Sequence, residues 1–375
     1  MRIAINAAYL RAGSHDGIAR FARGVIDNFP QLGDDVLVYT SAVTEFDNHD
    51  RVQYRRTPAA LAVRNGPLAS FLRLVLWSQT ILPFRTFRDR PDVLLSLGPE
   101  GSIAPVVPQV LVVHDLFPFI FPEIFGRLRP YFVYGLPRVL ASCDRLIAVS
   151  QYTKNDLVER LGVPEEKIFV VYEGVDSLFL SDDPGVAPKG CEPEPYFLFV
   201  GRCMLHKNIE TVMRAFAAVH HKLPHRLYAV LDLYGAADEA HFAKLKLLAS
   251  DLGITDKLRI YSRLSGRELL FLYRHATALL LLSKYEGFGL PPLEAMAVGT
   301  PAIVSEATAL AEVAGPGAIC IPGSDHERAA YEMAELATNS AYRARRSDAA
   351  VAHARQFTWE NTVRQIRSVL QHYAK

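Results

Sequence analysis

The chain has 375 residues, half of them hydrophobic, and a formal net charge of +1. This length allows two α/β domains with separate cores, and the near-zero charge argues against a protein that binds nucleic acid through a strong basic field. The cysteines form no CxxC pair, so neither a disulfide framework nor a zinc site is predicted for Cys143, Cys191, Cys203 and Cys320.

The N-terminal residues predict a strand, a glycine-containing loop and a helix. Residues 3–8 are an apolar strand, the loop contains Gly13 and Gly17, and residues 18–29 repeat apolar side chains at helical spacing. A strand that opens onto a glycine loop and a helix can bind a phosphate group. The loop lacks the GxGxxG spacing of dinucleotide-binding proteins. The start lacks the features of a signal peptide, and no apolar run reaches the ~20 residues that span a bilayer. We expect a cytoplasmic protein, soluble or peripheral at the inner face of the plasma membrane.

An arginine-rich segment follows a second strand at residues 36–40. Residues 64–90 contain one acidic residue, Asp89, and interleave large apolar side chains with Arg64, Arg73, Arg85, Arg88 and Arg90. One interpretation is a core helix with solvated arginines. The other is a basic and apolar face that meets an anionic lipid surface or a lipid-linked acceptor. The sequence does not separate the two.

Two short strands place a histidine at the edge of a predicted parallel sheet. Residues 92–97 and 110–113 are apolar, and the second run ends at His114. A lone histidine is more often structural, but ligands of α/β sheets bind at the carboxyl ends of the strands, where imidazole can donate a hydrogen bond. Further strands are predicted at 145–149 and 168–172, and the second of them ends at Glu173.

A segment rich in proline and glycine divides the chain. We predict a first domain over residues 1–180, a linker over 181–195 and a second domain over 196–357, with a last helix over 358–375. The strand at 196–200 leads into a loop with Arg202 and Lys207, before a helix for which Asn208 is the expected N-cap. Two cations beside a helix N-terminus suit a diphosphate. The alternative is a pair of solvated surface cations.

The most informative stretch is the run over residues 283–301, which follows an apolar strand at 278–282. It predicts a strand, a glycine loop and a short helix that begins at two prolines and stops at Gly299. Glu286 lies on the loop and Glu294 about one turn inside the helix. Gly287 and Gly289 let backbone N–H groups approach a ligand, and the helix N-terminus favours phosphate. Carboxylates with backbone donors between them suit a ligand with hydroxyls and phosphates, such as a nucleotide-sugar.

This run resembles the signature of retaining glycosyltransferase family 4, in which seven residues separate two glutamates. The resemblance implies the α/β fold known as GT-B, with two Rossmann-like domains whose parallel sheets face each other across a cleft and a C-terminal helix that crosses back to the first domain. It implies that Glu294 holds the donor ribose, and that the transferred sugar and its phosphate contact Glu286, Gly287, Phe288, Gly289 and Leu290.

The resemblance also assigns roles outside the run. Arg202 and Lys207 would hold the donor pyrophosphate without a metal, and His114 would lie near the donor sugar. Arg263 and Leu264 would meet the nucleotide base, largely through backbone. Two departures stand out. Relatives often have adjacent glycines where this chain has residues 13–17, so the loop role falls to Gly17, and they commonly have asparagine where this chain has Glu173.

The resemblance therefore implies a retaining, metal-independent glycosyltransferase that uses no cofactor and forms an α-linkage. Residues 114–123 and 285–291 are most similar to bacterial mannosyltransferases of polysaccharide and lipopolysaccharide O-antigen biosynthesis. GDP-mannose is accordingly the first expectation for the donor and a UDP-hexose the second, with a saccharide or lipid-linked saccharide as acceptor. The alternatives are a sugar-nucleotide epimerase of the same fold and a non-catalytic nucleotide-sugar binding protein.

Overall fold

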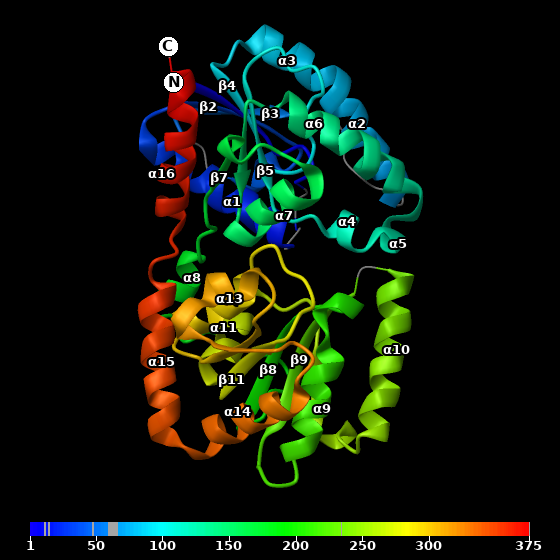
Figure 1. Cartoon of the computed structure of the whole chain (residues 1–375). Coiled ribbons are helices and arrows are strands. Elements are labelled where there is room, and N and C mark those ends of the chain that lie inside the picture. The colour runs from blue at the N-terminus through cyan, green and yellow to red at the C-terminus, as the bar shows by residue number, and fades with distance from the viewer. Residues whose placement is uncertain (11–12, 14–15, 47–48, 59–66, 234, 375) are drawn as a thin grey trace. The chain divides into compact units, whose positions relative to one another are not determined.

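A computed structural model describes residues 1–10, 13, 16–46, 49–58, 67–233 and 235–374 of the chain. The chain divides into two compact units (Figure 1). Unit 1 comprises Met1–Gly174 and Trp359–Lys375, and unit 2 comprises Val175–Thr358. The segment expected as a linker, residues 181–195, lies within unit 2. Arg64 of the arginine-rich segment, and Ser14 and His15 of the first glycine loop, lie outside the described residues.

Unit 1 is built on a parallel sheet of order β3-β2-β1-β4-β5-β6-β7. Most of its strands are short apolar runs buried on both faces, as parallel sheets covered by helices require. The strands are β1 (Arg2–Asn6), β2 (Asp35–Thr40), β3 (Val52–Arg56), β4 (Val93–Ser96), β5 (Gln109–Val113), β6 (Arg145–Ala148) and β7 (Ile168–Val170). The helices are α1 (Gly17–Asn28), α2 (Pro67–Leu76), α3 (Leu82–Asp89), α4 (Phe117–Ile120), α5 (Pro122–Phe125), α6 (Leu136–Ser142), α7 (Gln151–Leu161) and α16 (Trp359–Leu370).

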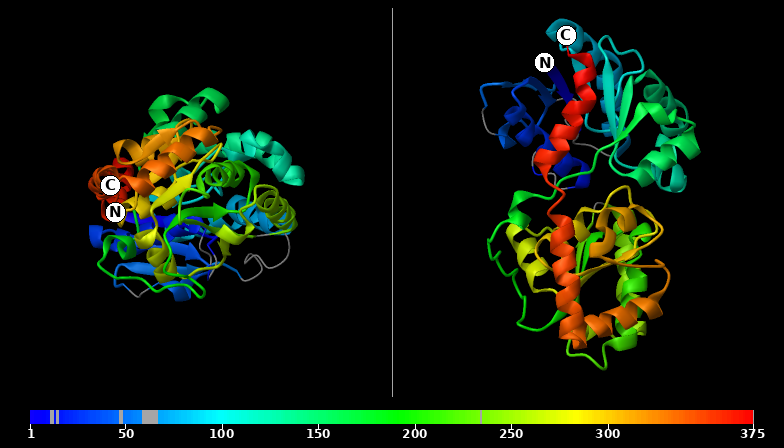
Figure 2. Two further views of the ribbon diagram at one scale, coloured as in Figure 1. Left: turned by 90° about the horizontal axis from the view of Figure 1, so that it is seen from below. Right: turned by 60° about the vertical axis from the view of Figure 1, so that its left-hand side comes forward.

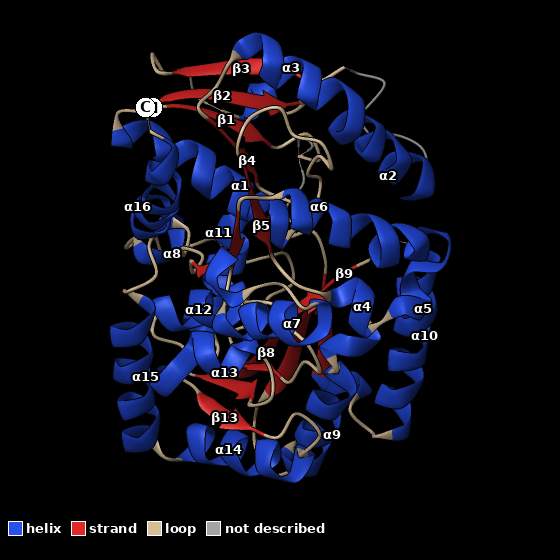
Figure 3. Ribbon diagram, turned by 45° about the horizontal axis from the view of Figure 1, so that its top comes forward, coloured by secondary structure: helices blue, strands red, loops and turns tan. Residues whose placement is uncertain are grey.

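Unit 2 repeats this design with a parallel sheet of order β10-β9-β8-β11-β12-β13, and Figure 3 shows strands in red among helices in blue. The strands are β8 (Tyr196–Arg202), β9 (Arg226–Asp232), β10 (Leu258–Tyr261), β11 (Ala278–Leu281), β12 (Ala302–Ser305) and β13 (Ile319–Ile321). The helices are α8 (Ser177–Leu180), α9 (Ile209–Val219), α10 (Ala236–Asp251), α11 (Gly266–His275), α12 (Leu290–Ala297), α13 (Ala309–Ala314), α14 (His326–Thr338) and α15 (Ser340–Ala354).

The strand order reverses at the first strand of each sheet. β1 pairs with β2 on one side and β4 on the other, and β8 pairs with β9 and β11. In open α/β sheets such a reversal leaves a crevice at the carboxyl ends of the strands, because the flanking loops diverge to opposite faces. Each unit therefore has one predictable location for a ligand site.

The last helix, α16, packs on α1 of unit 1, as the sequence predicted (Figure 2). Trp359 lies against Gly24 so closely that a Cβ at Gly24 would be 2.2 Å from the indole ring. Thr362 donates a hydrogen bond of 2.8 Å to the carbonyl of Tyr172, and Arg367 forms a 2.6 Å ion pair with buried Asp34. These contacts bind the end of the chain to α1, to the residue before β2 and to the segment that follows β7.

The arginine-rich segment is helical but not one regular helix. A π-helical turn over Trp77–Ile81 joins α2 to α3. Trp77 is fully buried and its indole N–H donates to Asn6 Oδ1 at 3.1 Å. Within the part of the chain that the structure describes, no helix is both long and apolar enough to cross a membrane.

Candidate functional site

The loops that follow β8 and β11 are joined by hydrogen bonds in unit 2. The backbone N–H of Lys284 donates to the carbonyl of His206 at 2.7 Å. The Asn208 side chain donates to the carbonyls of Leu282 at 2.9 Å and Gly323 at 2.7 Å. Asn208 occupies the N-cap position of α9, as predicted, but its backbone is left-handed, with φ of 56°, and its side chain makes no capping hydrogen bond. Its amide instead ties three loops together.

Lys207 and Glu286 meet at this edge of the sheet. Lys207 Nζ lies 2.6 Å from Glu286 Oε1, and Ser283 Oγ donates to the same oxygen at 2.7 Å. Both charged side chains are partly exposed, at 20% and 12%. The ion pair fixes the direction of the Lys207 ammonium and leaves the ammonium partly exposed. An ammonium held in this way at a loop surface is positioned to meet an anionic ligand.

Arg202 is held by an acid that the sequence analysis did not single out. Its Nε donates to Asp238 Oδ2 at 2.9 Å. Asp238 lies in the first turn of α10 and its side chain is only 5% exposed, whereas Arg202 is 43% exposed. The buried carboxylate therefore orients an exposed guanidinium. The available signal was an acidic residue in the first turn of the helix after β9.

The glycine loop leads into α12 as predicted, with prolines at the start of the helix. Gly289 precedes the helix with φ of +117°, and a Cβ there would lie 2.3 Å from Leu310 Cδ2. Both the backbone angle and the close contact require glycine. Phe288 and Leu290 are buried on either side of it, so the loop is fixed by packing. Because Pro291 and Pro292 carry no N–H, Leu290 supplies the one backbone donor among the first three residues of α12.

Glu294, the second glutamate of the run, is fully buried on α12. Its Oε2 accepts a 2.9 Å hydrogen bond from the hydroxyl of Tyr273 on α11. Sequence reasoning missed Tyr273, which orients the carboxylate. Arg263 is exposed on the loop after β10, has φ of 54°, and donates its N–H to Asp232 Oδ1 at 3.2 Å; Leu264 follows it, half-buried.

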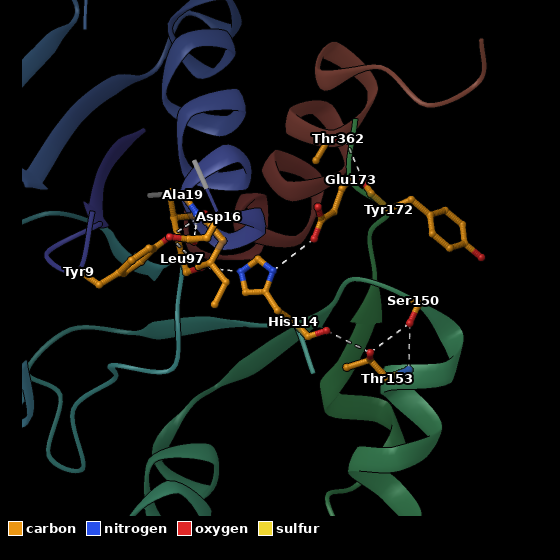
Figure 4. A network of polar contacts seen from close by, with 11 residues as sticks. Tyr9, Asp16, Ala19, Leu97, His114, Ser150, Thr153, Tyr172, Glu173 and Thr362 are labelled. Carbon is orange, nitrogen blue, oxygen red and sulfur yellow. Dashed lines mark hydrogen bonds and ion pairs between the residues drawn. The ribbon is translucent and has the colours of Figure 1, made fainter. Parts of the chain in front are cut away.

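The remaining predicted residues, Gly17 and His114, belong to unit 1. Gly17 begins α1, and a Cβ there would meet nothing within 4 Å. His114 follows β5, and Figure 4 shows its ring between two acceptors. Nε2 lies 2.9 Å from the carbonyl oxygen of Leu97 and Nδ1 lies 3.3 Å from Glu173 Oε1. The backbone carbonyl of His114 accepts from Thr153 Oγ1 at 3.4 Å.

A buried acid, Glu100, lies near this histidine on the loop after β4. Burial raises the pKa of its carboxyl from 4.5 to about 7, against lowering effects from its own backbone and from His114. Its backbone carbonyl accepts from Asn6 Nδ2 at 2.8 Å. The sequence analysis did not identify Glu100, because an acid after a strand carries no signal of burial.

Two protein-family models match the chain, one over most of unit 1 and the other over most of unit 2. The model of Glycosyltransferase Family 4 matches residues 15–177, and the model of glycosyl transferases group 1 matches residues 188–353.

Curated relatives include two named as mannosyltransferases. The O-antigen chain mannosyltransferase RfbU of Salmonella typhimurium is 34% identical over 220 residues, which cover 58% of this chain and 58% of the relative. The O-antigen chain mannosyltransferase B of Escherichia coli is 25% identical over 322 residues, covering 81% and 82%. D-inositol 3-phosphate glycosyltransferase 1 of Catenulispora acidiphila is 31% identical over 261 residues, covering 67% and 62%. The chain thus spans less than two thirds of RfbU and of the Catenulispora relative.

Solved structures similar to this one have the GT-B fold. Sucrose-phosphate synthase from Thermosynechococcus elongatus superposes with a TM-score of 0.79 at 17% identity, covering 99% of this chain and 98% of that one. WaaG, a glycosyltransferase involved in lipopolysaccharide biosynthesis, gives 0.70 at 15% identity, covering 98% and 99%. The predicted fold of two parallel-sheet α/β domains is confirmed.

Glu100 provides a test of the unit 1 geometry through the pH dependence of stability. Because its pKa is higher in the folded state than in the unfolded chain, the folded protein binds more protons between pH 4.5 and about 7, so stability falls as pH rises through that window. We expect Glu100→Gln to raise the free energy of unfolding by about 3 kcal/mol at pH 8 and by little at pH 4.5.

Urea unfolding at the two pH values measures this difference. The exposed Glu123 of α5 offers a matched control, and Glu123→Gln should change stability by the same small amount at both. An equal effect of Glu100→Gln at pH 4.5 and pH 8 would show that Glu100 is not buried as described.

Proposed function

The chain belongs to glycosyltransferase family 4, and we propose that it transfers a hexose from a nucleotide-diphosphate sugar to a saccharide or lipid-linked saccharide in cell-surface polysaccharide biosynthesis. The observation that carries the proposal is the arrangement after β8 and β11. Arg202 ends β8 and Lys207 lies on the loop that follows it. Glu286 lies on the loop after β11 and Glu294 on α12 beyond it, with hydrogen bonds between the two loops. The cations fit a diphosphate, and the carboxylates fit hydroxyl groups.

The proposed donor is GDP-mannose. Support comes from the two relatives that are named as O-antigen chain mannosyltransferases and from the sequence of residues 285–291. In this assignment Glu294 binds the ribose hydroxyls, with Tyr273 fixing the direction of the carboxylate. Arg263 and Leu264 meet the base. A UDP-hexose is the alternative donor for the same site.

The proposed chemistry is substitution at the anomeric carbon with retention, which gives an α-linkage. The bond from that carbon to the phosphate oxygen breaks, the bond to the acceptor oxygen forms on the same face, and the acceptor proton passes to the departing phosphate. Negative charge grows on the diphosphate in this step. Arg202, Lys207 and the N-terminus of α12 stabilise that charge, and for this reason we propose that no metal is required.

We further propose that the protein works at an anionic membrane surface. Four large apolar side chains on α2 and α3 are more than half exposed: Leu72 at 57%, Leu76 at 55%, Phe84 at 62% and Phe87 at 66%. The core-facing side chains of this segment are buried: Leu74 of α2, Trp77 of the π-helical turn and Leu82 of α3. The exposed apolar side chains alternate with Arg73, Arg85 and Arg88, a combination that inserts into a lipid interface and attracts anionic headgroups.

Thermal-shift measurements test which nucleotide-sugar the protein binds as its donor. A ligand present at 100 times its Kd stabilises the native state by about 2.7 kcal/mol. We expect GDP and GDP-mannose to raise the Tm of the wild type by the same amount with and without EDTA. The shift should be lost in Lys207→Ala and in Glu294→Gln. The matched control is Lys284→Ala, which removes the same charge from an exposed side chain of the adjoining loop. A shift with UDP compounds alone would overturn GDP-mannose, and no shift with any nucleotide would contradict the site.

Flotation with vesicles of phosphatidylglycerol and phosphatidylcholine measures membrane binding. We expect the wild type to float with the anionic vesicles and the double variant Phe84→Ser, Phe87→Ser to remain at the bottom. Leu247→Ser is the control, because Leu247 is 67% exposed on α10 of unit 2. If the wild type does not float with anionic vesicles, the membrane proposal is wrong. The proposal for the donor site does not depend on this result.

A further inference from the structure

The ring of His114 is bonded on both sides by groups that accept hydrogen bonds. The Leu97 carbonyl, 2.9 Å from Nε2, cannot donate, so Nε2 carries a hydrogen. On the other side, Nδ1 lies 3.3 Å from a Glu173 carboxylate oxygen, which in its ionised form also only accepts. Two acceptors match the doubly protonated ring, in which both nitrogens donate.

We propose that Glu173 is a positioning residue that keeps His114 positively charged at neutral pH, so that unit 1 holds a fixed imidazolium at the carboxyl ends of β4 and β5. This inference rests on the glycosyl transfer proposed above, because a fixed positive charge can assist a reaction in which negative charge develops.

Both partners of the pair are buried and held by separate elements. The side chains of His114 and Glu173 are 9% and 5% exposed. The rings of His114 and of Phe21 on α1 pack nearly perpendicular to each other, with centroids 4.8 Å apart. Thr362 of α16 donates to the carbonyl of Tyr172, next to Glu173, and Thr153 of α7 donates to the carbonyl of His114 (Figure 4). The pair is therefore fixed before any ligand arrives.

The charges that face His114 favour its protonated form. Burial alone lowers the pKa of the imidazole, but the hydrogen bond and charge of Glu173, the Leu97 carbonyl and the charge of Asp115 together raise it above its ordinary value. α1 and α16 contribute aromatic rings to this region, through Phe21 and Trp359.

Two other titratable groups interact with the His114–Glu173 pair: Glu100 and Tyr9. Glu100 interacts with the charge of His114, but its own pKa is raised to about 7, so it is partly protonated at neutral pH. Tyr9 has its pKa raised by burial and by Glu100, Asp16 and Glu173, against Arg23, and is therefore uncharged. Glu173 is thus the acid in direct contact with the ring.

Titration by NMR tests the proposal without a donor. The chain has 12 histidines, and the His114 signal is identified by its loss in His114→Gln. We expect His114 of the wild type to titrate above the ~6.5 of ordinary imidazole, to titrate lower in Glu173→Gln, and to return towards the wild-type midpoint in Glu173→Asp. His206 of unit 2, whose pKa burial lowers to about 4, is the internal control and should not move.

The pH profile of kcat/KM separates positioning from a merely structural role. Relative to the wild type, Glu173→Gln should lose little activity at pH 5.5 and about tenfold at pH 8.5, because only the alkaline limb depends on the imidazolium. Circular dichroism confirms folding; should Glu173→Gln not fold, Glu173→Asp and the wild-type titration decide.

Three results would overturn the proposal. These are a wild-type His114 that titrates at or below ordinary imidazole, a His114 midpoint that does not change in Glu173→Gln, and a loss of activity that is equal at every pH. The NMR titration needs no substrate, so its result does not depend on whether the proposed donor is correct. A failure of the donor proposal can therefore be distinguished from a failure of the His114 proposal.

Discussion

The parallel pairing of β8 with β11 is the constraint on which the unit 2 site depends. Parallel neighbours end at the same edge of a sheet, so residues about 80 positions apart in the chain, such as Lys207 and Glu286, come within 2.6 Å. The Asn208 amide and the Lys284 N–H then join the two loops. The site is positioned by buried strands and by bonds between loops, and this rigidity is what preorganised charge stabilisation requires.

The two units share a topology but present different chemistry at the same place. In unit 2 the reversal of strand order carries exposed cations, each held by an acid, as with Arg202 and Asp238. In unit 1 the loops beyond the reversal, after β4, β5 and β7, carry a buried histidine held by Glu173, with Glu100 nearby. Exposed cations meet anions that arrive from solvent, whereas a buried charge requires a fixed counter-ion because it has lost its hydration.

Much of the fold was predictable because it depends on local patterns. Apolar runs gave the strands, and the prolines and glycines around α12 gave the helix that follows residues 283–289. The partners that orient the site were not predictable, because they lie far along the chain: Asp238 is 36 residues from Arg202 and Tyr273 is 21 from Glu294. The capping hydrogen bond expected from the Asn208 side chain is absent for the same reason, since its amide bonds to loops 74 and 115 residues away.

A crystal structure of the protein with GDP tests the central claim, that the loop edge of unit 2 binds the donor diphosphate. The account predicts phosphate oxygens within hydrogen-bonding distance of Arg202 and Lys207, and ribose hydroxyls at Glu294, with Glu286 released from or shared with Lys207. Nucleotide bound away from the loops after β8 and β11, or a diphosphate that contacts neither cation, would contradict it.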